Sequence, residues 1–163
     1  QEEIGNLMKL VLRLFTTDAK IFDDYNIRLK VLGEREGLDP KIVKAILQLE
    51  EKTKHNTAGT LAICLNYGGQ REIVDAVKKI VQSGAKAEEI DANLIAENLY
   101  GAEVPPVDVI VRTSGEKRLS NFMLWRAAYS EFIFLNKQFP EMTKEDVTAI
   151  IEEYSRRHRR FGG

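Results

Sequence analysis

The sequence predicts an α/β fold in which a mainly parallel sheet is flanked by helices. Segments with strand-like and helix-like patterns alternate along the chain, and this order is typical of the class. Two strand-like segments, residues 60–67 and 107–111, are almost wholly apolar, as expected for parallel strands covered on both faces. The 163 residues, 44% of them hydrophobic, suffice for one ordinary domain with its own core. We therefore expect residues 1–163 to form a single domain.

The first half of the chain is predicted to contribute two helices and two strands. Apolar residues at helical offsets predict an amphipathic first helix, and these are Ile4, Leu7, Met8, Val11, Leu12 and Phe15. Residues 26–33 alternate apolar and polar side chains and end in glycine, which predicts a half-buried strand at or near the sheet edge. Asp39 is a capping residue before Pro40, so a helix should run from there to about Lys54. Residues 60–67 then supply a central strand.

The second half is predicted to continue the alternation. A helix after Gly68-Gly69 should bury one apolar face, made of Ile73, Val74, Val77, Ile80 and Val81. A shorter helix over 91–100, a strand over 107–111, a helix over 120–129 and a strand over 131–135 should follow. Thr143 and Asp146 have the spacing of a capping box, so the last helix should begin at Thr143.

Composition excludes several classes of protein. The formal net charge is -1, and nucleic-acid-coating domains usually carry a marked basic excess, so no nucleic-acid partner is expected. The single cysteine, Cys64, cannot form a disulfide or a thiolate zinc cluster within this chain and fits a reducing cytoplasm. No apolar run approaches the roughly 18 residues that a membrane-spanning helix needs.

The loop after the strand at 107–111 has the composition of an anion site. Arg112 and Arg118 offer planar pairs of donors, Ser114-Gly115 offers a flexible turn with backbone N–H groups, and Ser120 would begin the next helix. A diphosphate fits this chemistry. The alternative is that both arginines are solvated and that Ser120 only caps a helix, and spacing alone does not decide between the two.

Two other features are ambiguous in the same way. Gly68-Gly69 follows a predicted strand and opens a helix, so it would serve either a phosphate or close helix–sheet packing. Glu131 begins a buried strand, where its carboxylate needs a cation as partner, either an arginine or a metal ion.

Three segments together resemble the cis-prenyltransferase family, typified by undecaprenyl diphosphate synthase. These are LNYGGQREI at 65–73, VDVIVRTSGEKRLSNFMLWRAAYSEFIF at 107–134 and RRFGG at 159–163. The resemblance covers essentially the whole chain. It implies an enzyme that condenses isopentenyl diphosphate with an allylic diphosphate, such as farnesyl diphosphate, with the help of Mg2+. The product would be a polyprenyl diphosphate, a lipid carrier for cell-wall or glycan synthesis.

The resemblance also implies roles for individual residues. The positions matching the isopentenyl diphosphate site are Arg112, Arg118, Leu119 and Ser120. Glu131 matches a carboxylate associated with Mg2+. Arg160, Phe161 and Gly162 would reach across a homodimer interface towards the neighbouring active site, and the first helix would line the tunnel for the growing chain. The enzyme would be cytoplasmic, with peripheral membrane contact through its greasy product.

One departure from the family pattern affects the mechanism. The family carries an Asp-Gly-Asn-Gly-Arg segment near its N-terminus, with the principal catalytic aspartate, and this chain has none. We therefore expect the N-terminal part of the fold to be missing from it. Two alternatives stay open: a non-catalytic partner subunit of a cis-prenyltransferase complex, which the intact loop argues against, and a generic nucleotide-binding module, which leaves most of the resemblance unexplained.

Overall fold

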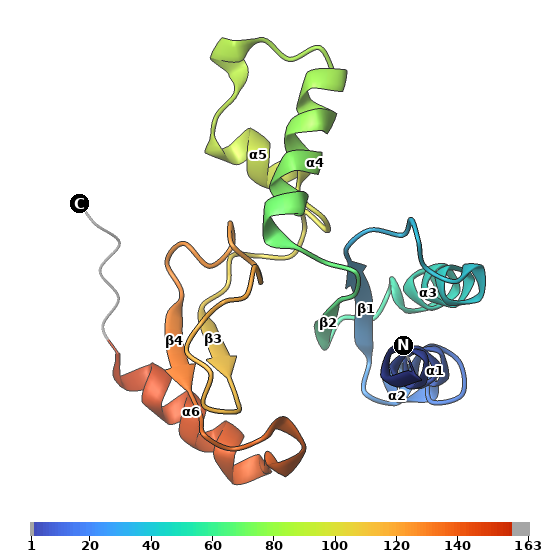
Figure 1. Ribbon diagram of the computed structural model, residues 1–163, viewed down its shortest axis with the longest axis vertical. Coiled ribbons are helices and arrows are strands. Elements are labelled where there is room, and N and C mark those ends of the chain that lie inside the picture. The colour runs from blue at the N-terminus through green and yellow to red at the C-terminus, as the bar shows by residue number, and fades with distance from the viewer. Residues whose placement is uncertain (1, 158–163) are drawn as a thin grey trace. The chain divides into compact units, whose positions relative to one another are not determined.

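The computed structural model describes residues 2–157 and confirms the α/β class (Figure 1). The chain forms two compact units, one of residues Gln1–Tyr67 and Asp75–Val104, the other of residues Gly68–Val74 and Pro105–Gly163. Each unit contains one pair of parallel strands. The described strands therefore form two two-stranded sheets, where the sequence predicted one larger, mainly parallel sheet.

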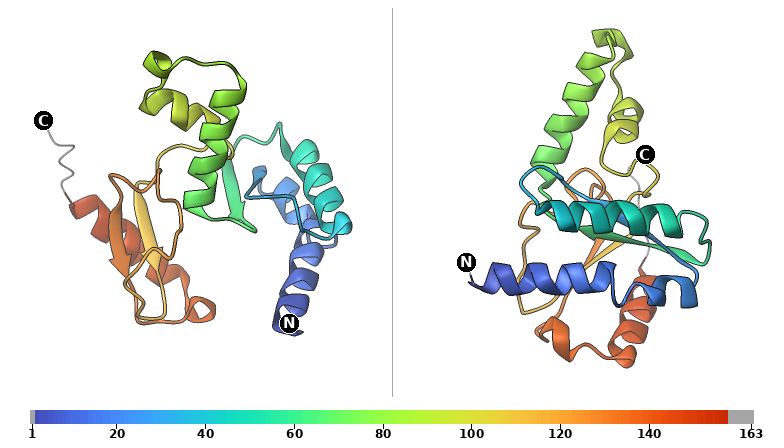
Figure 2. Two further views of the ribbon diagram at one scale, coloured as in Figure 1. Left: turned by 45° about the horizontal axis from the view of Figure 1, so that its top comes forward. Right: turned by 90° about the vertical axis from the view of Figure 1, so that its right-hand side faces the viewer.

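The first unit packs three helices against one strand pair. Strands β1 (Ile27–Leu32) and β2 (Gly59–Cys64) run parallel, with Ile27 opposite Gly59 and Leu32 opposite Cys64. Helices α1 (Glu2–Phe15), α2 (Lys20–Asp24) and α3 (Pro40–Thr53) accompany them, and α1 and α3 lie side by side (Figure 2). The buried core residues are Phe15, Ala19, Phe22, Leu29, Val31, Ile42, Ala45, Ile46, Leu49 and Leu65.

The first two predicted helices are confirmed, with one correction to the apolar stripe. Asp39 caps α3 by accepting a hydrogen bond of 2.7 Å from the backbone N–H of Lys41. Phe15 at the end of α1 is buried, and Met8, Val11 and Leu12 pack against the core. Leu7 is 55% exposed, so it does not belong to the buried face of α1 within this unit.

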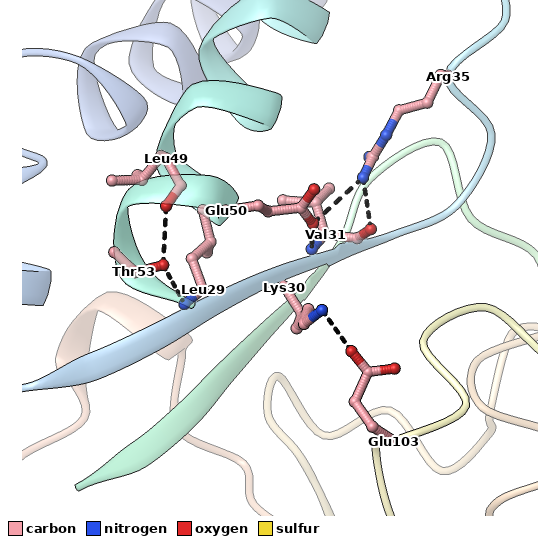
Figure 3. A network of polar contacts seen from close by, with 8 residues as sticks. All are labelled: Leu29, Lys30, Val31, Arg35, Leu49, Glu50, Thr53 and Glu103. Atoms are coloured by element: carbon pink, nitrogen blue, oxygen red, sulfur yellow. Dashed lines mark hydrogen bonds and ion pairs between the residues drawn. The ribbon is translucent and has the colours of Figure 1, made fainter. Parts of the chain in front are cut away.

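The prediction that β1 lies at or near the sheet edge is confirmed, and α3 covers that edge (Figure 3). The outward N–H of Leu29 donates to Thr53 Oγ1 at 3.0 Å, and that of Val31 donates to Glu50 Oε1 at 2.7 Å. The carbonyl of Val31 accepts from Arg35 Nη2 at 2.8 Å. Because an uncovered edge invites pairing with another chain, these side chains terminate the sheet at β1.

The prediction that β2 is covered on both faces is wrong for the part of the chain that the structure describes. Leu61, near the start of β2, is 45% exposed, and Thr60 is exposed as well. Helices α2 and α3 contact β1, and β1 is the only strand that pairs with β2 among residues 2–157. The first unit therefore leaves part of the apolar surface of β2 exposed to solvent.

Helix α4 (Gly69–Gln82) is present as predicted, but its buried line is different. Glu72, Ala76 and Ile80 are buried, whereas Val74 and Val81 are 47% and 65% exposed. After α4 come a short 3-10 helix (Ala87–Glu89) and α5 (Ala92–Asn98), which confirms the predicted helix over 91–100. The buried face of α4 differs from the predicted one because it includes Glu72, whose carboxylate forms a buried ion pair with Arg126.

The second unit contains β3 (Val109–Arg112), β4 (Glu131–Phe134) and α6 (Lys144–Arg156). The two strands run parallel, with Val109 opposite Glu131 and Arg112 opposite Phe134. A 3-10 helix (Phe139–Glu141) leads into α6, which the predicted capping box of Thr143 and Asp146 begins. The strand predictions at 107–111 and 131–135 and the last helix are therefore confirmed.

The helix predicted over 120–129 is absent, and the segment forms a series of turns. Ser120, Asn121 and Met123 have φ angles of 48°, 65° and 51°. A right-handed helix requires negative φ, and a left-handed one costs roughly 1–2 kcal/mol per residue for ordinary side chains. Three left-handed residues within four positions therefore prevent a helix here, so Ser120 does not begin one.

Two remaining predictions concern the surface and the chain end. No helix among the described residues is long and apolar enough to cross a membrane. The predicted tail residues Arg160, Phe161 and Gly162 lie outside the described residues.

Candidate functional site: the loop after β3

Arg112, the last residue of β3, organises the loop that follows it. Its Nη1 donates to the backbone carbonyl of Arg118 at 2.5 Å and to Ser120 Oγ at 3.1 Å. The guanidinium of Arg112 thus links the end of β3 to the far end of the loop at Arg118 and Ser120. Three of the residues assigned to a substrate diphosphate by resemblance are therefore neighbours in the structure.

A small pocket of about 110 Å³ lies beside these residues. It is lined by Ile110, Val111, Arg112, Arg118, Leu119 and Phe122. Arg118 forms an ion pair with Glu116, yet its side chain remains 62% exposed and accessible to a ligand. The loop from Arg112 to Ser120 carries three cationic side chains and one carboxylate, so its local charge is positive although the whole chain is slightly acidic. The combination of cations, a hydroxyl and an apolar wall suits a phosphorylated organic ligand.

The backbone N–H groups of the Ser114-Gly115 turn are already used. Ser114 N–H donates to the carbonyl of Lys137 at 2.9 Å, and Gly115 N–H donates to that of Leu135 at 2.8 Å. The Ser114 hydroxyl also bonds Gln138 at 2.8 Å. The turn is therefore held to the segment after β4, and its two backbone N–H groups are not available to a phosphate.

Glu131 does not join this group. Its Oε2 accepts from Arg157 Nη1 at 2.8 Å, and Arg157 also bonds Glu153 on α6 at 3.0 Å and the carbonyl of Phe132 at 2.9 Å. The hydrogen bond to Glu131 is the main reason that the pKa of Arg157 is raised above its ordinary value, and the bond to Glu153 adds to it. Of the two partners left open for Glu131, the structure provides the arginine.

The strand register explains why Glu131 is apart from the loop. Glu131 lies opposite Val109, at the start of the strand pair, and Arg112 lies opposite Phe134, at its end. Three residues of strand separate the two ends by about 10 Å. Because side chains alternate between faces, Glu131 and Arg112 also project from opposite faces of the pair.

The paired glycines serve close packing. The first two N–H groups of α4 donate to Asn121: Gly69 N–H to its carbonyl at 2.7 Å and Gln70 N–H to its Oδ1 at 2.8 Å. A Cβ atom on Gly68 would lie 2.8 Å from Asn121 Nδ2, and one on Gly69 would lie 2.8 Å from the Leu124 side chain. Of the two alternatives for Gly68-Gly69, the geometry thus favours packing over a phosphate site.

A buried ion pair near the loop was not predicted. Arg126 Nη1 lies 2.6 Å from Glu72 Oε1, and the two side chains are 3% and 0% exposed. It joins the first turn of α4 to the turns that follow Ser120. The sequence signal was available but ambiguous, since Glu72 falls beside the apolar positions of α4 and Arg126 sits in a segment that looked helical.

The whole chain matches a family of known proteins. Residues 1–162 match the prenyltransferase family model described as undecaprenyl diphosphate synthase. The isoprenyl transferase of Thermotoga maritima is 44% identical over 165 residues, covering 100% of this chain and 71% of that protein. The (2E,6E)-farnesyl-diphosphate-specific ditrans,polycis-undecaprenyl-diphosphate synthase of Micrococcus luteus is 39% identical, covering 100% of this chain and 67% of that protein.

Solved structures give the same result. A probable undecaprenyl diphosphate synthase from Campylobacter jejuni is 32% identical with a TM-score of 0.91, and the match covers 100% of this chain and 76% of that one. Lavandulyl diphosphate synthase from Lavandula x intermedia, solved with dimethylallyl diphosphate, has a TM-score of 0.93 at 28% identity, covering 100% and 72%. In sequence and in fold alike, the chain belongs to the cis-prenyltransferase family of undecaprenyl diphosphate synthases.

Proposed function

We propose that this chain condenses isopentenyl diphosphate with an allylic diphosphate such as farnesyl diphosphate, and that the product is a polyprenyl diphosphate used as a lipid carrier in cell-wall or glycan synthesis. The observation that supports this most is that Arg112 and Arg118 line one pocket, with Ser120 bonded to Arg112, in a chain of this family. In the reaction, the double bond of isopentenyl diphosphate attacks the first carbon of the allylic partner. That carbon loses its diphosphate, and a proton then leaves the new chain.

The loop residues are proposed to bind the diphosphate of isopentenyl diphosphate. The guanidinium of Arg118 is exposed to solvent and so accessible to phosphate oxygens, and a guanidinium matches two such oxygens at once. Arg112 is held at the pocket by its bonds to the Arg118 carbonyl and Ser120, so it is pre-positioned. Leu119 and Phe122 supply apolar wall for the hydrocarbon part of the substrate.

The resemblance implies Mg2+, and the chemistry of a departing diphosphate favours a hard divalent cation. The described residues do not form a complete Mg2+ site at this loop. No cluster of three potential metal-binding side chains occurs among residues 2–157, and Glu131 is paired with Arg157 on the other face of the strands. Mg2+ therefore remains part of the proposal for the reaction, without a site among these side chains.

The same proposal covers the oligomeric state of the enzyme, its compartment and its contact with the membrane. We expect a homodimer in the cytoplasm that associates with the membrane only peripherally, through its hydrophobic product. No nucleic-acid partner is expected for a chain with a net charge of -1. The alternative of a non-catalytic partner subunit is not favoured, because such a subunit has no need for a cationic loop arranged around a pocket of its own.

The test is incorporation of labelled isopentenyl diphosphate into butanol-extractable product, with farnesyl diphosphate and Mg2+. We expect Arg118→Ala in the complete protein to lower kcat/KM at least about tenfold, since a charge-assisted hydrogen bond contributes roughly 1.5–3 kcal/mol. Lys117→Ala is the matched control, because it removes the same charge from the neighbouring exposed residue, which does not line the pocket. It should stay within about threefold of the native enzyme.

Two results would count against the proposal. Equal losses in Arg118→Ala and Lys117→Ala would mean that only the net charge of the loop matters. If the complete, folded protein makes no product with any allylic starter, the partner-subunit alternative becomes the better account.

A further inference from the structure

Asn121 connects two segments that are far apart in sequence, the start of α4 and the loop after β3. It lies 51 positions after Gln70, whose N–H it accepts at 2.8 Å through Oδ1. Its carbonyl accepts the N–H of Gly69 at 2.7 Å. The first N–H groups of a helix have no partner within the helix, and a capping residue normally comes from just before it. Here a distant residue caps α4.

The fit between these segments is tight enough to transmit a displacement. An added Cβ on Gly69 would lie 3.0 Å from the Asn121 carbonyl oxygen and 3.0 Å from the backbone nitrogen of Leu124. One turn further along α4, Glu72 makes the buried ion pair with Arg126. The turns over residues 120–126 are therefore attached to α4 at two points, through Asn121 and through Arg126.

Asn121 lies between Ser120, which contacts a residue of the pocket, and Phe122, which lines it. Ser120 accepts a hydrogen bond from Arg112, and Phe122 is part of the wall. Both Ser120 and Asn121 have left-handed backbone angles, 48° and 65°, which asparagine tolerates better than most residues. A change in the position of Asn121 would thus move the hydroxyl and the wall together.

We infer that Asn121 is a positioning residue for the diphosphate loop: by capping α4 it fixes Ser120, and through Ser120 the Arg112 guanidinium, in the geometry that binds substrate. The inference rests on the proposed function and extends it to the role of the paired glycines. Gly68 and Gly69 are needed because only glycine leaves room for Asn121 to reach the helix.

The experiment compares steady-state kinetics of three variants of the complete protein. Asn121→Gly removes the side-chain cap and keeps the left-handed backbone accessible, and Gly69→Ala disturbs the same contact from the other side. Gly59→Ala is the matched control, because an added Cβ at that position in β2 meets only the Ile27 side chain, at an ordinary contact distance of 3.5 Å. We expect the first two to raise KM for isopentenyl diphosphate about tenfold with kcat within threefold, and the control to leave both unchanged.

KM does not depend on the fraction of folded enzyme, so partial unfolding does not obscure the result. If both variants melt at lower temperature but keep the native KM, Asn121 and Gly69 are structural only and the inference is overturned. Binding of isopentenyl diphosphate alone, measured by calorimetry, tests the proposed function and the role of Asn121 separately. A native protein that does not bind it contradicts the proposed function, whereas equal binding by native protein and Asn121→Gly contradicts only the inference.

Discussion

At the scale of single residues, the ion pair of Glu72 and Arg126 in the second unit is almost completely buried. Both charges are removed from water almost completely. Desolvation costs several kcal/mol per ion, and only close geometry such as the 2.6 Å contact offsets it. The pair therefore adds little net stability, and its effect is to specify how α4 meets the turns after Ser120.

This predicts an asymmetry between single and double substitutions. We expect Arg126→Met to lower the free energy of unfolding by about 3–5 kcal/mol, because the Glu72 carboxylate loses this partner in a buried site. Glu72→Leu combined with Arg126→Met should recover most of the loss. Arg156→Met is a suitable control, since Arg156 is 73% exposed and its pair with Glu153 should contribute less than about 1 kcal/mol.

Urea unfolding of the four proteins checks the prediction. A double variant as unstable as Arg126→Met would show that the two side chains act through other contacts and not mainly on each other.

At the scale of elements, helix starts were more predictable from sequence than helix faces. Asp39 and Thr143 cap α3 and α6 as their spacing indicated, because capping is a local interaction within four residues. The buried line of α4 and the turns over 120–129 were predicted wrongly. There, partners more than 50 positions away decide the structure: Arg126 draws Glu72 inward, and Asn121 bonds Gly69 and Gln70.

The cap of α6 should make stability depend on acid. The hydrogen bond from Lys137, followed by those from Thr143, lowers the pKa of Asp146 from 3.8 to about 2. A carboxylate with a lowered pKa stabilises the folded state above its unfolded pKa and loses that effect as the pH falls through its folded pKa. The contribution should therefore be complete above about pH 4 and disappear between about pH 4 and pH 2.

Asp146→Asn isolates this effect. We expect the native protein to melt at higher temperature than the variant at pH 6, and the difference to shrink below about pH 4 and to be lost as the pH falls through about 2. A difference that stays constant over this range would mean that the Asp146 charge is not what matters in the cap.

At the scale of the whole molecule, the structure brings together some of the residues that the family motifs assign to one site and separates another. Arg112, Arg118 and Ser120 meet because one loop carries all three, so contiguous sequence was enough to place them together. Glu131 is close to them in sequence but separate in space, because it begins β4 and the register of β4 places it opposite Val109, at the other end of β3 from Arg112. Which face a side chain takes depends on that register, and a single sequence does not reveal it.

The separation has a consequence for the proposed homodimer. If Glu131 serves a metal-assisted site at a diphosphate loop, a loop in a second copy of the chain is the candidate, because Arg112 of the same chain lies at the other end and on the other face of the strand pair. Each site would then consist of the loop of one chain and Glu131 of the other. Arg118→Ala would damage the loop, and Glu131→Gln would damage the contribution of the other chain. Mixed dimers would contain one site with both native residues.

We therefore expect the two weakly active variants to restore activity when they are unfolded and refolded together. Random pairing makes half of the dimers mixed, and each has one of two sites intact, so recovery should approach about a quarter of native activity. Each variant refolded alone is the control, and Lys117→Ala mixed with native protein shows the loss due to refolding. No recovery, with dimers verified by sedimentation, would restrict Glu131 to its ion pair with Arg157 and leave the loop of each chain to work without it.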